Sequence, residues 1–382
     1  MDTRYDRDTR LDKPLLLITW PGSNTSLPSV LLNSHLDSVS AESFKWFHDP
    51  FEAHLSPDDG KLYTRGAHDD KCIGMQYLEA IKELEINFHY SPTRTVHISY
   101  VPEEEVGGFD GMAKFVKSEE FKKLNVGFVL DEGQALTTDE FRTFYADKSP
   151  WHVVIKATGV PGHGSRMYDN SAMENMMKSI EVITKFRENQ FDLVKAGLAV
   201  TSEVISANPV FLKAGIPSPT WRPDMRKRIA EKLAPGWRNM TYEITEKGTL
   251  RDFMGRPLMT ATDGSNPWWS IFKQAVEADG AKLAKPEILT STPDARIMSQ
   301  IGIPTLGFSP MKNTQILLHD HNEFEVLPFV ILFNTQDMLH RSVHLRSFDE
   351  DSNLLGAKFY GLLWTCYLVV SEVFLQPANQ LL

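Results

Sequence analysis

Short apolar runs that end in acidic or histidine residues are the feature that most constrains the fold of this chain. Four runs have the length of buried strands: Ser29–His35, Arg94–Val101, Val126–Asp131 and Ile303–Ser309. Between the first two lies Cys72–Glu85, whose apolar residues recur at helical spacing. Strands that alternate with helices in this way indicate an α/β fold with a largely parallel sheet.

The middle of the chain has a different character. Trp151–Gly159 alternates like a strand with one exposed face. Ser171 followed by Glu174 is the capping-box pattern that begins a helix, and a stretch rich in proline and basic residues comes after it. We therefore expect a main domain formed by residues 1–148 and 256–382, with an α+β domain inserted at 149–255.

Composition excludes several classes of function. The chain has 382 residues with 50 acidic against 40 basic side chains, and no basic tract suited to nucleic acid. Its two cysteines, Cys72 and Cys366, support neither a disulfide framework nor a thiolate zinc site. The apolar run Phe359–Val370 is too short to span a bilayer, so we expect a packed element and no membrane partner. The polar N-terminus lacks a secretory signal, which makes the cytoplasm the default location.

Acidic and imidazole side chains gather after these strands and before the helix. The carboxyl ends of parallel strands meet at one edge of a sheet, where ligands bind. So many carboxylates need a counter-charge, and we expect a divalent metal, with two ions favoured because a carboxylate can bridge them. Two such ions ~3.5–4 Å apart can activate one water and polarise one carbonyl. The side chains concerned are those of His35, Asp37, Asp69, Asp70, Glu103, Glu104, Glu105, Asp131, Glu132, His319 and His321.

The spacing of some of these residues suggests that they have different roles. His35 and Asp37 are two apart, so on a strand they share a face and the carboxylate can accept the ring N–H. The alternative is a surface turn with an unrelated histidine. Glu104 and Glu105 are adjacent, and on an extended chain they would point apart and could hold different roles. Histidines without ligand spacing, such as His97, are expected to be exposed or half-buried.

Several motifs together resemble a known family. "LLNSHLD", "YTRGAHDDKC", "VPEEEVGG", "LDEG", "PGHGSR" and "LLHDHNE" occur in order between Pro14 and Glu323. In this order they resemble the aminoacylase-1 group of the M20 metallopeptidase family, especially its plant members. The resemblance implies a three-layer α/β/α catalytic domain with two zinc ions per chain, and an inserted lid domain that also forms a homodimer. It implies hydrolysis of N-acyl-L-amino acids, a small-molecule substrate, to a carboxylate and a free amino acid.

The resemblance also implies metal ligands. His35 and Glu132 would bind one zinc ion, Glu105 and His319 would bind the other, and Asp69 would bridge both. The peptide bond after Asp69 would be cis. His321 is an alternative to His319, but the family's ligand precedes its glutamate by four positions, as His319 precedes Glu323.

Other roles follow from the same resemblance. Asp37 would support His35, and Glu104 would be the general base. His163, on the lid, would stabilise the oxyanion, usually from the partner subunit. Arg296 would bind the substrate carboxylate. The alternatives are an exposed loop histidine for His163 and a surface ion pair for Arg296.

Three departures from the family leave other readings open. Only thirteen residues precede Pro14, Thr220 passes almost directly into "WRPDMRK" where roughly two lid strands are missing, and the sequence after Glu325 does not match. A shortened lid is expected to weaken the homodimer by exposing a sheet edge. A dipeptidase-type amidohydrolase, or a metal-binding form with impaired turnover, are the competing hypotheses.

Overall fold

The computed structural model describes residues 2–6, 13–86, 89–159, 165–167, 169–212, 240–246, 249, 251–278 and 280–326. The chain divides into two compact units, one formed by residues 1–147 with 251–382 and the other by residues 148–250. The insertion expected from the sequence ran from 149 to 255. The predicted features at His163, Thr220 and Phe359–Val370 lie outside the described residues.

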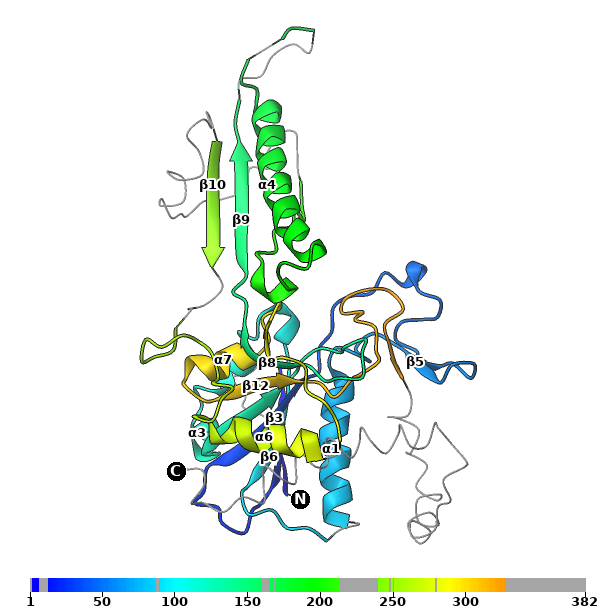
Figure 1. Ribbon diagram of the computed structural model, residues 1–382, viewed down its shortest axis with the longest axis vertical. Helices are drawn as coiled ribbons and strands as arrows, with labels where there is room; N and C mark the ends of the chain where they lie inside the picture. Colours follow the sequence, from blue (N-terminus) through cyan, green and yellow to red (C-terminus); the bar gives the residue numbers. More distant parts are fainter. Residues whose placement is uncertain are drawn as a thin grey trace. The chain divides into compact units, whose positions relative to one another are not determined.

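An eight-stranded mixed sheet forms the centre of the first unit (Figure 1). Its four central strands, β6, β3, β7 and β12, run parallel to one another, whereas β2 pairs antiparallel with β6 and β8 pairs antiparallel with β12. This confirms the predicted α/β class. The order across the sheet is β1 (Asp2–Asp6), β2 (Leu15–Trp20), β6 (Val96–Val101), β3 (Ser29–His35), β7 (Val126–Asp131), β12 (Thr305–Phe308), β8 (Thr143–Asp147) and β11 (Glu287–Leu289).

Helices cover both faces of this sheet. Val30 and Leu32 of β3 share a core cluster with residues of α1 (Lys71–Ile86) and α6 (Pro267–Ala278). Leu31, which points to the opposite face, shares a second cluster with residues of α2 (Met112–Phe115), α3 (Glu119–Lys123) and α7 (Ala295–Gln300). The unit therefore has three layers, as the resemblance implied.

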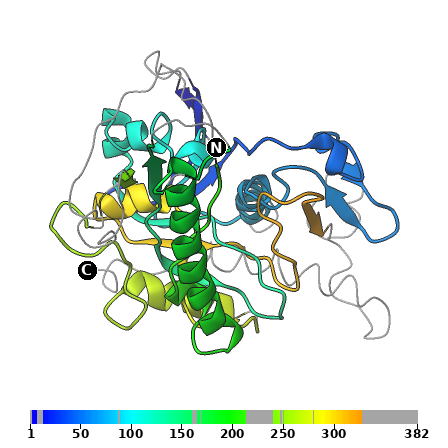
Figure 2. The same cartoon turned by 90° about the horizontal axis from the view of Figure 1, so that it is seen from above.

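A small sheet beside α1 brings distant segments together. The strand β5 (Lys61–Tyr63) pairs with β4 (His54–Leu55) on one side and with β13 (Phe324–Val326) on the other. Figure 2 shows the two ends of this sheet in blue and orange, because they come from opposite ends of the described chain. The pairing places the residues just before Phe324 next to those just after Tyr63.

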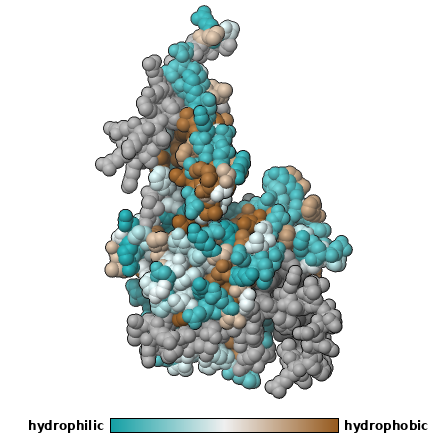
Figure 3. Space-filling model, viewed as in Figure 1, coloured by the Kyte–Doolittle hydropathy of each residue, from teal (hydrophilic) through white to brown (hydrophobic). Residues whose placement is uncertain are grey.

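The second unit consists, in its described part, of a two-stranded antiparallel sheet and one long helix. β9 (Trp151–Ala157) pairs with β10 (Met240–Glu246), and α4 (Ala172–Lys195) contacts β9. Ser171 Oγ accepts the Glu174 N–H at 3.2 Å, which confirms the predicted helix start. Apolar side chains remain exposed on this unit (Figure 3), among them Trp151, Val153, Met177 and Phe186.

One expectation about a histidine is corrected by burial. His97 is buried, contrary to prediction, because β6 is an interior strand of a sheet whose two faces are covered by helices. Its Nδ1 lies 2.9 Å from Thr19 Oγ1. Among the described residues, no helix has the length and apolar character needed to cross a membrane.

Candidate metal centre

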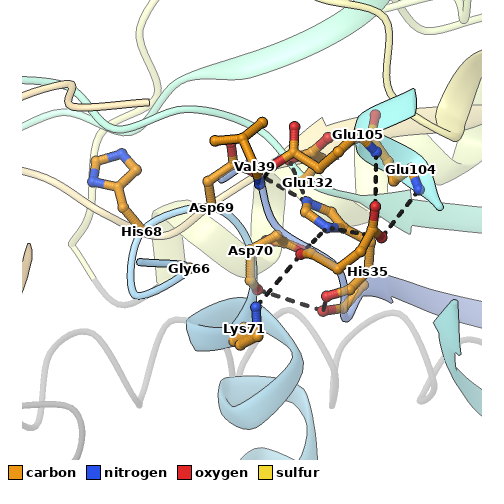
Figure 4. A network of polar contacts seen from close by, with 12 residues as sticks. His35, Val39, Gly66, His68, Asp69, Asp70, Lys71, Glu104, Glu105 and Glu132 are labelled. Atoms are coloured by element: carbon orange, nitrogen blue, oxygen red, sulfur yellow. Dashed lines mark hydrogen bonds and ion pairs between the residues drawn. The ribbon is translucent and has the colours of Figure 1, made fainter. Parts of the chain in front are cut away.

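The acidic residues converge where three parallel strands end. β3 ends at His35 and is followed by Asp37, β6 is followed by Glu104 and Glu105, and β7 is followed by Glu132. These strands are neighbours in the sheet, so their carboxyl ends lie side by side. Figure 4 shows the side chains of His35, Glu104, Glu105 and Glu132 gathered near the start of α1, which begins at Lys71.

The first group of possible ligands, here called the inner group, consists of His35, Asp70 and Glu132. Their ligand atoms lie within 4.8 Å of one another. His35 Nε2 is 3.7 Å from Glu132 Oε2, and it is only 3.1 Å from Asp69 Oδ1. The resemblance had named only Asp69 of these two aspartates as a ligand, whereas both lie within reach of His35.

The second group, here called the outer group, consists of Asp69, Glu105 and His319. His319 Nε2 is 2.8 Å from Glu105 Oε2 and 3.2 Å from Asp69 Oδ2. Asp69 therefore presents one carboxylate oxygen to His35 and the other to His319, which is the placement that a bridging ligand needs. The Asp69–Asp70 peptide bond is cis. His321 lies instead near Glu42, with His321 Nε2 3.6 Å from Glu42 Oε2.

Asp37 connects the loops after β3 and β6. Its carbonyl oxygen is the nearest acceptor for His35 Nδ1, at 3.1 Å, while its carboxylate Oδ1 is 3.7 Å away. The carboxylate oxygens accept the backbone N–H groups of Glu104, at 3.1 Å, and Glu105, at 3.2 Å. Asp37 thus orients the histidine mainly through its backbone, because β3 ends at His35 and the strand geometry assumed from the sequence does not reach Asp37.

The three consecutive glutamates are not on an extended chain, which corrects the reasoning from sequence. Glu103 has a left-handed φ of 71°, and Glu104–Val106 form a 3₁₀ helix, η2. With about three residues per turn, neighbouring side chains still leave the backbone in different directions. Glu105 Oε1 accepts the Val39 N–H at 3.1 Å, whereas Glu103 accepts from Lys13 and from the Asp110 N–H outside the cluster.

Burial and interactions between the charged groups shift the pKa values of the side chains in the cluster. Burial, together with the negative charge of Glu132, holds the pKa of Glu104 far above its usual range. Burial likewise raises the pKa of Glu132. Burial lowers the pKa of His35, but its contacts with Asp37, Asp69 and Glu132 outweigh this and raise it. Hydrogen bonds with Asp69 and Glu105 raise the pKa of His319 to about 10.

The donor set fits a pair of divalent cations. Five carboxylates face two imidazoles here, and within the described ranges no lysine or arginine forms an ion pair with any of the five. Such an acidic cluster in a low-dielectric site needs positive charge, and a cation supplies it without further side chains. Imidazole nitrogen and carboxylate oxygen are ligands that zinc accepts. The carboxylates are those of Asp69, Asp70, Glu104, Glu105 and Glu132.

Comparison with known proteins agrees with this arrangement. The model of peptidase family M20/M25/M40 matches residues 31–328, well over half of the 382 residues. The chain belongs to this M20 family. The M20 chain is 40% identical to mouse aminoacylase-1 over 361 residues, covering 90% of this chain and 83% of the mouse protein. It is 38% identical to human aminoacylase-1 over 353 residues, covering 89% of this chain and 82% of the human protein.

Solved structures show the same fold at low identity. The dipeptidase Dug1p of Saccharomyces cerevisiae aligns with a TM-score of 0.61 at 12% identity, covering 95% of this chain and 83% of that one. A tripeptidase of Staphylococcus aureus aligns with a TM-score of 0.61 at 15% identity, covering 98% of this M20 chain and 89% of that one.

Two further residues were named from the resemblance. His163 lies outside the described residues of the M20 protein. Arg296 belongs to α7 and is only 6% exposed, so the alternative of a surface ion pair does not hold. Its charge acts on Asp147. Burial raises the pKa of Asp147 to about 8, even though the positive charge of Arg296 lowers it. His68, beside Asp69, is buried and points away from the cluster (Figure 4).

Sequence reasoning gave no individual role to several buried residues of this M20 site. Asp131 lies beneath the cluster, accepting the Asn33 side-chain amide at 2.9 Å and the Ala295 N–H. Asp294, just before α7, is also buried. Glu323 is fully buried and binds the loop that carries Asp69. Only Asp131, which stands directly before Glu132 at a strand end, was placed in the acidic cluster by its sequence position.

Proposed function

We propose that this protein is a zinc-dependent aminoacylase, which hydrolyses N-acyl-L-amino acids to a carboxylate and a free L-amino acid. The observation that carries the proposal is the convergence of His35, Asp69, Glu105, Glu132 and His319 at one edge of the sheet. The similarity to proteins named aminoacylase-1, at 36% to 40% identity, supports the substrate class.

Two zinc ions per chain are proposed. His35 and Glu132 would hold one ion, Glu105 and His319 the other, and Asp69 would bridge them through the two oxygens that face His35 and His319. Bound there, the ions would polarise the amide carbonyl and acidify a water. Asp70 would support the inner position, since its carboxylate lies within 4.8 Å of the ligand atoms of His35 and Glu132.

Glu104 is the proposed general base. Its carboxylate would take a proton from the attacking water and return it to the amine nitrogen as the amide bond breaks. The Asp37 carboxylate supports this role because it holds the Glu104 N–H and so fixes the start of η2. The positive charge of bound cations would lower the raised pKa of Glu104 and so favour its ionised form.

Substrate binding and assembly extend the proposal. Arg296 would bind the substrate carboxylate, and its burial supports this because a guanidinium away from water forms stronger hydrogen bonds to a carboxylate. His163 of the partner subunit would stabilise the oxyanion in a homodimer. Exposed apolar side chains on the second unit, such as Trp151 and Met177, support a self-association surface. A cytoplasmic location is proposed by default.

The test is release of free methionine from N-acetyl-L-methionine by the purified full chain. Activity is expected to disappear after chelation and to return with zinc at two ions per chain. A methionine-containing dipeptide serves as the competing substrate, and faster cleavage of it would favour a dipeptidase. Zinc bound at two per chain without any hydrolysis would refute the proposed activity while leaving the metal centre intact.

A further inference from the structure

The loops that carry Asp69 and His319 are joined by a buried ion pair. Arg65 lies shortly before Asp69 in the chain, and Glu323 lies shortly after His319. Arg65 Nη1 is 2.6 Å from Glu323 Oε2, and the two side chains are 3% and 0% exposed. The Arg65 guanidinium also lies over the Trp46 ring, 5.1 Å from its centroid.

Each member of this pair also binds the backbone of the other member's loop. Glu323 Oε1 accepts the N–H groups of His68, at 2.8 Å, and Asp69, at 3.1 Å, while Oε2 accepts the Gly66 N–H at 3.1 Å. Arg65 Nη2 donates to the carbonyl oxygen of Asp320, at 3.0 Å, the residue next to His319. The pair therefore fixes both loops with respect to each other.

His319 needs such support more than His35 does. The His35 side chain is 1% exposed and ends a strand of the central sheet, whereas the His319 side chain is 53% exposed. His319 lies in a loop, with a left-handed φ of 61°, and β13 begins only at Phe324. Its position is therefore set by the backbone that Arg65 and Glu323 hold.

We propose that Arg65 and Glu323 are positioning residues that keep Asp69 and His319 in register, so that the outer group binds its metal ion. This inference rests on the proposed metal-dependent function. The inner group depends on the pair less, because His35 and Glu132 are carried by the neighbouring strands β3 and β7. Because Asp69 also faces His35, loss of the pair is expected to weaken both ions, and the outer one more, since His319 belongs to the outer group alone.

Glu323→Gln is the sharpest probe. The amide oxygen can still accept from His68 and Asp69, but the NH₂ group can neither accept from Gly66 nor pair with Arg65. Arg65→Lys is the second variant, because it keeps the charge and loses the forked contact with Asp320 and Glu323. The measurement is zinc binding by competition with a chromogenic chelator, together with the melting temperature of the metal-free protein.

The wild-type chain is expected to bind two zinc ions, and each variant to bind one of them ~10–100-fold less tightly, with a smaller loss for the other. Glu287→Gln is the matched control, because it breaks the Arg142–Glu287 pair, 2.8 Å long, whose arginine also lies over an aromatic ring. This control is expected to keep both zinc affinities.

Three results would overturn the inference. These are wild-type affinities in both variants, an equal loss of both ions, or a selective loss in the Glu287→Gln control as well. If Glu323→Gln does not fold, Arg65→Lys decides. A wild-type chain that binds no zinc would overturn the proposed function too, whereas two ions bound equally by all variants would overturn the positioning role alone.

Discussion

Replacing Asp37 by asparagine tests how the base is held in place. The Asp37 carboxylate accepts the N–H groups of Glu104 and Glu105 at 3.1 and 3.2 Å. Asparagine keeps one acceptor oxygen and turns an NH₂ group toward the second N–H, so one hydrogen bond to a charged group is lost. Such a bond contributes about 1.5–3 kcal/mol, and the 28% exposure of Asp37 favours the lower end.

A loss of about 1.5 kcal/mol corresponds to about a tenfold smaller population of the aligned η2. We therefore expect Asp37→Asn to lower kcat on N-acetyl-L-methionine about tenfold, with KM little changed because Asp37 does not bind the substrate. His35 keeps its orientation in this variant, since its Nδ1 uses the backbone carbonyl of residue 37.

The assay compares steady-state kinetics and zinc content of the wild type, Asp37→Asn and Asp252→Asn. Asp252 is a matched control because its Oδ1 also accepts two backbone N–H groups, those of Met254 at 2.9 Å and Arg256 at 2.8 Å, in an exposed turn. Unchanged kcat in Asp37→Asn would refute the reasoning. So would an equal fall in Asp252→Asn, because that would show a general loss of stability.

Three further predictions concern the base, the pH dependence of stability and the core. Glu104→Gln is expected to lower kcat by ~10²–10⁴-fold while both zinc ions remain bound, as measured by metal analysis. Burial lowers the pKa of His97 to about 4, so the unfolded chain takes up its proton first as pH falls below about 6.5, and stability is lost through this window. From pH 7.5 to 5 the loss from His97 is about 2 kcal/mol, and urea unfolding should show a correspondingly smaller pH dependence in His97→Gln. Phe272→Ala is expected to cost about 3–5 kcal/mol in urea unfolding, because this fully buried ring packs edge-on against Phe308, with centroids 4.9 Å apart.

The sequence predicted the fold because local patterns and the overall arrangement agree. Ser29–His35 and Val126–Asp131 are strands with the predicted bounds, and the helix expected at Cys72–Glu85 extends by one residue at each end. Each pattern is a continuous apolar run or a helical stripe, and either is readable without knowledge of its neighbours. The parallel order of β6, β3 and β7 then brings the strand ends together.

The details of the site could not be read in this way, because they depend on where elements stop. The strand rule applied to His35 and Asp37 assumed an extended chain through both, yet β3 ends at His35. The same assumption was made for Glu104 and Glu105, which lie instead in η2. The spacing of two residues predicts the directions of their side chains only within a regular strand or helix. The proposed ligands lie at the ends of such elements, where this prediction fails.

The Arg65–Glu323 pair shows why support for a site is harder to infer than the site itself. A ligand must carry a nitrogen or oxygen donor, so histidine and acid motifs narrow the choice. Arginine is not such a ligand, and in sequence Glu323 has the same carboxylate as the ligands and as Glu42 of the exposed Lys45–Glu42 pair. Only the fold, by pairing β13 with β5, places Glu323 beside Gly66 and distinguishes a buried pair from an exposed one. The same reasoning predicts that residues closing other long loops onto this sheet edge will matter for metal affinity more than their sequence context suggests.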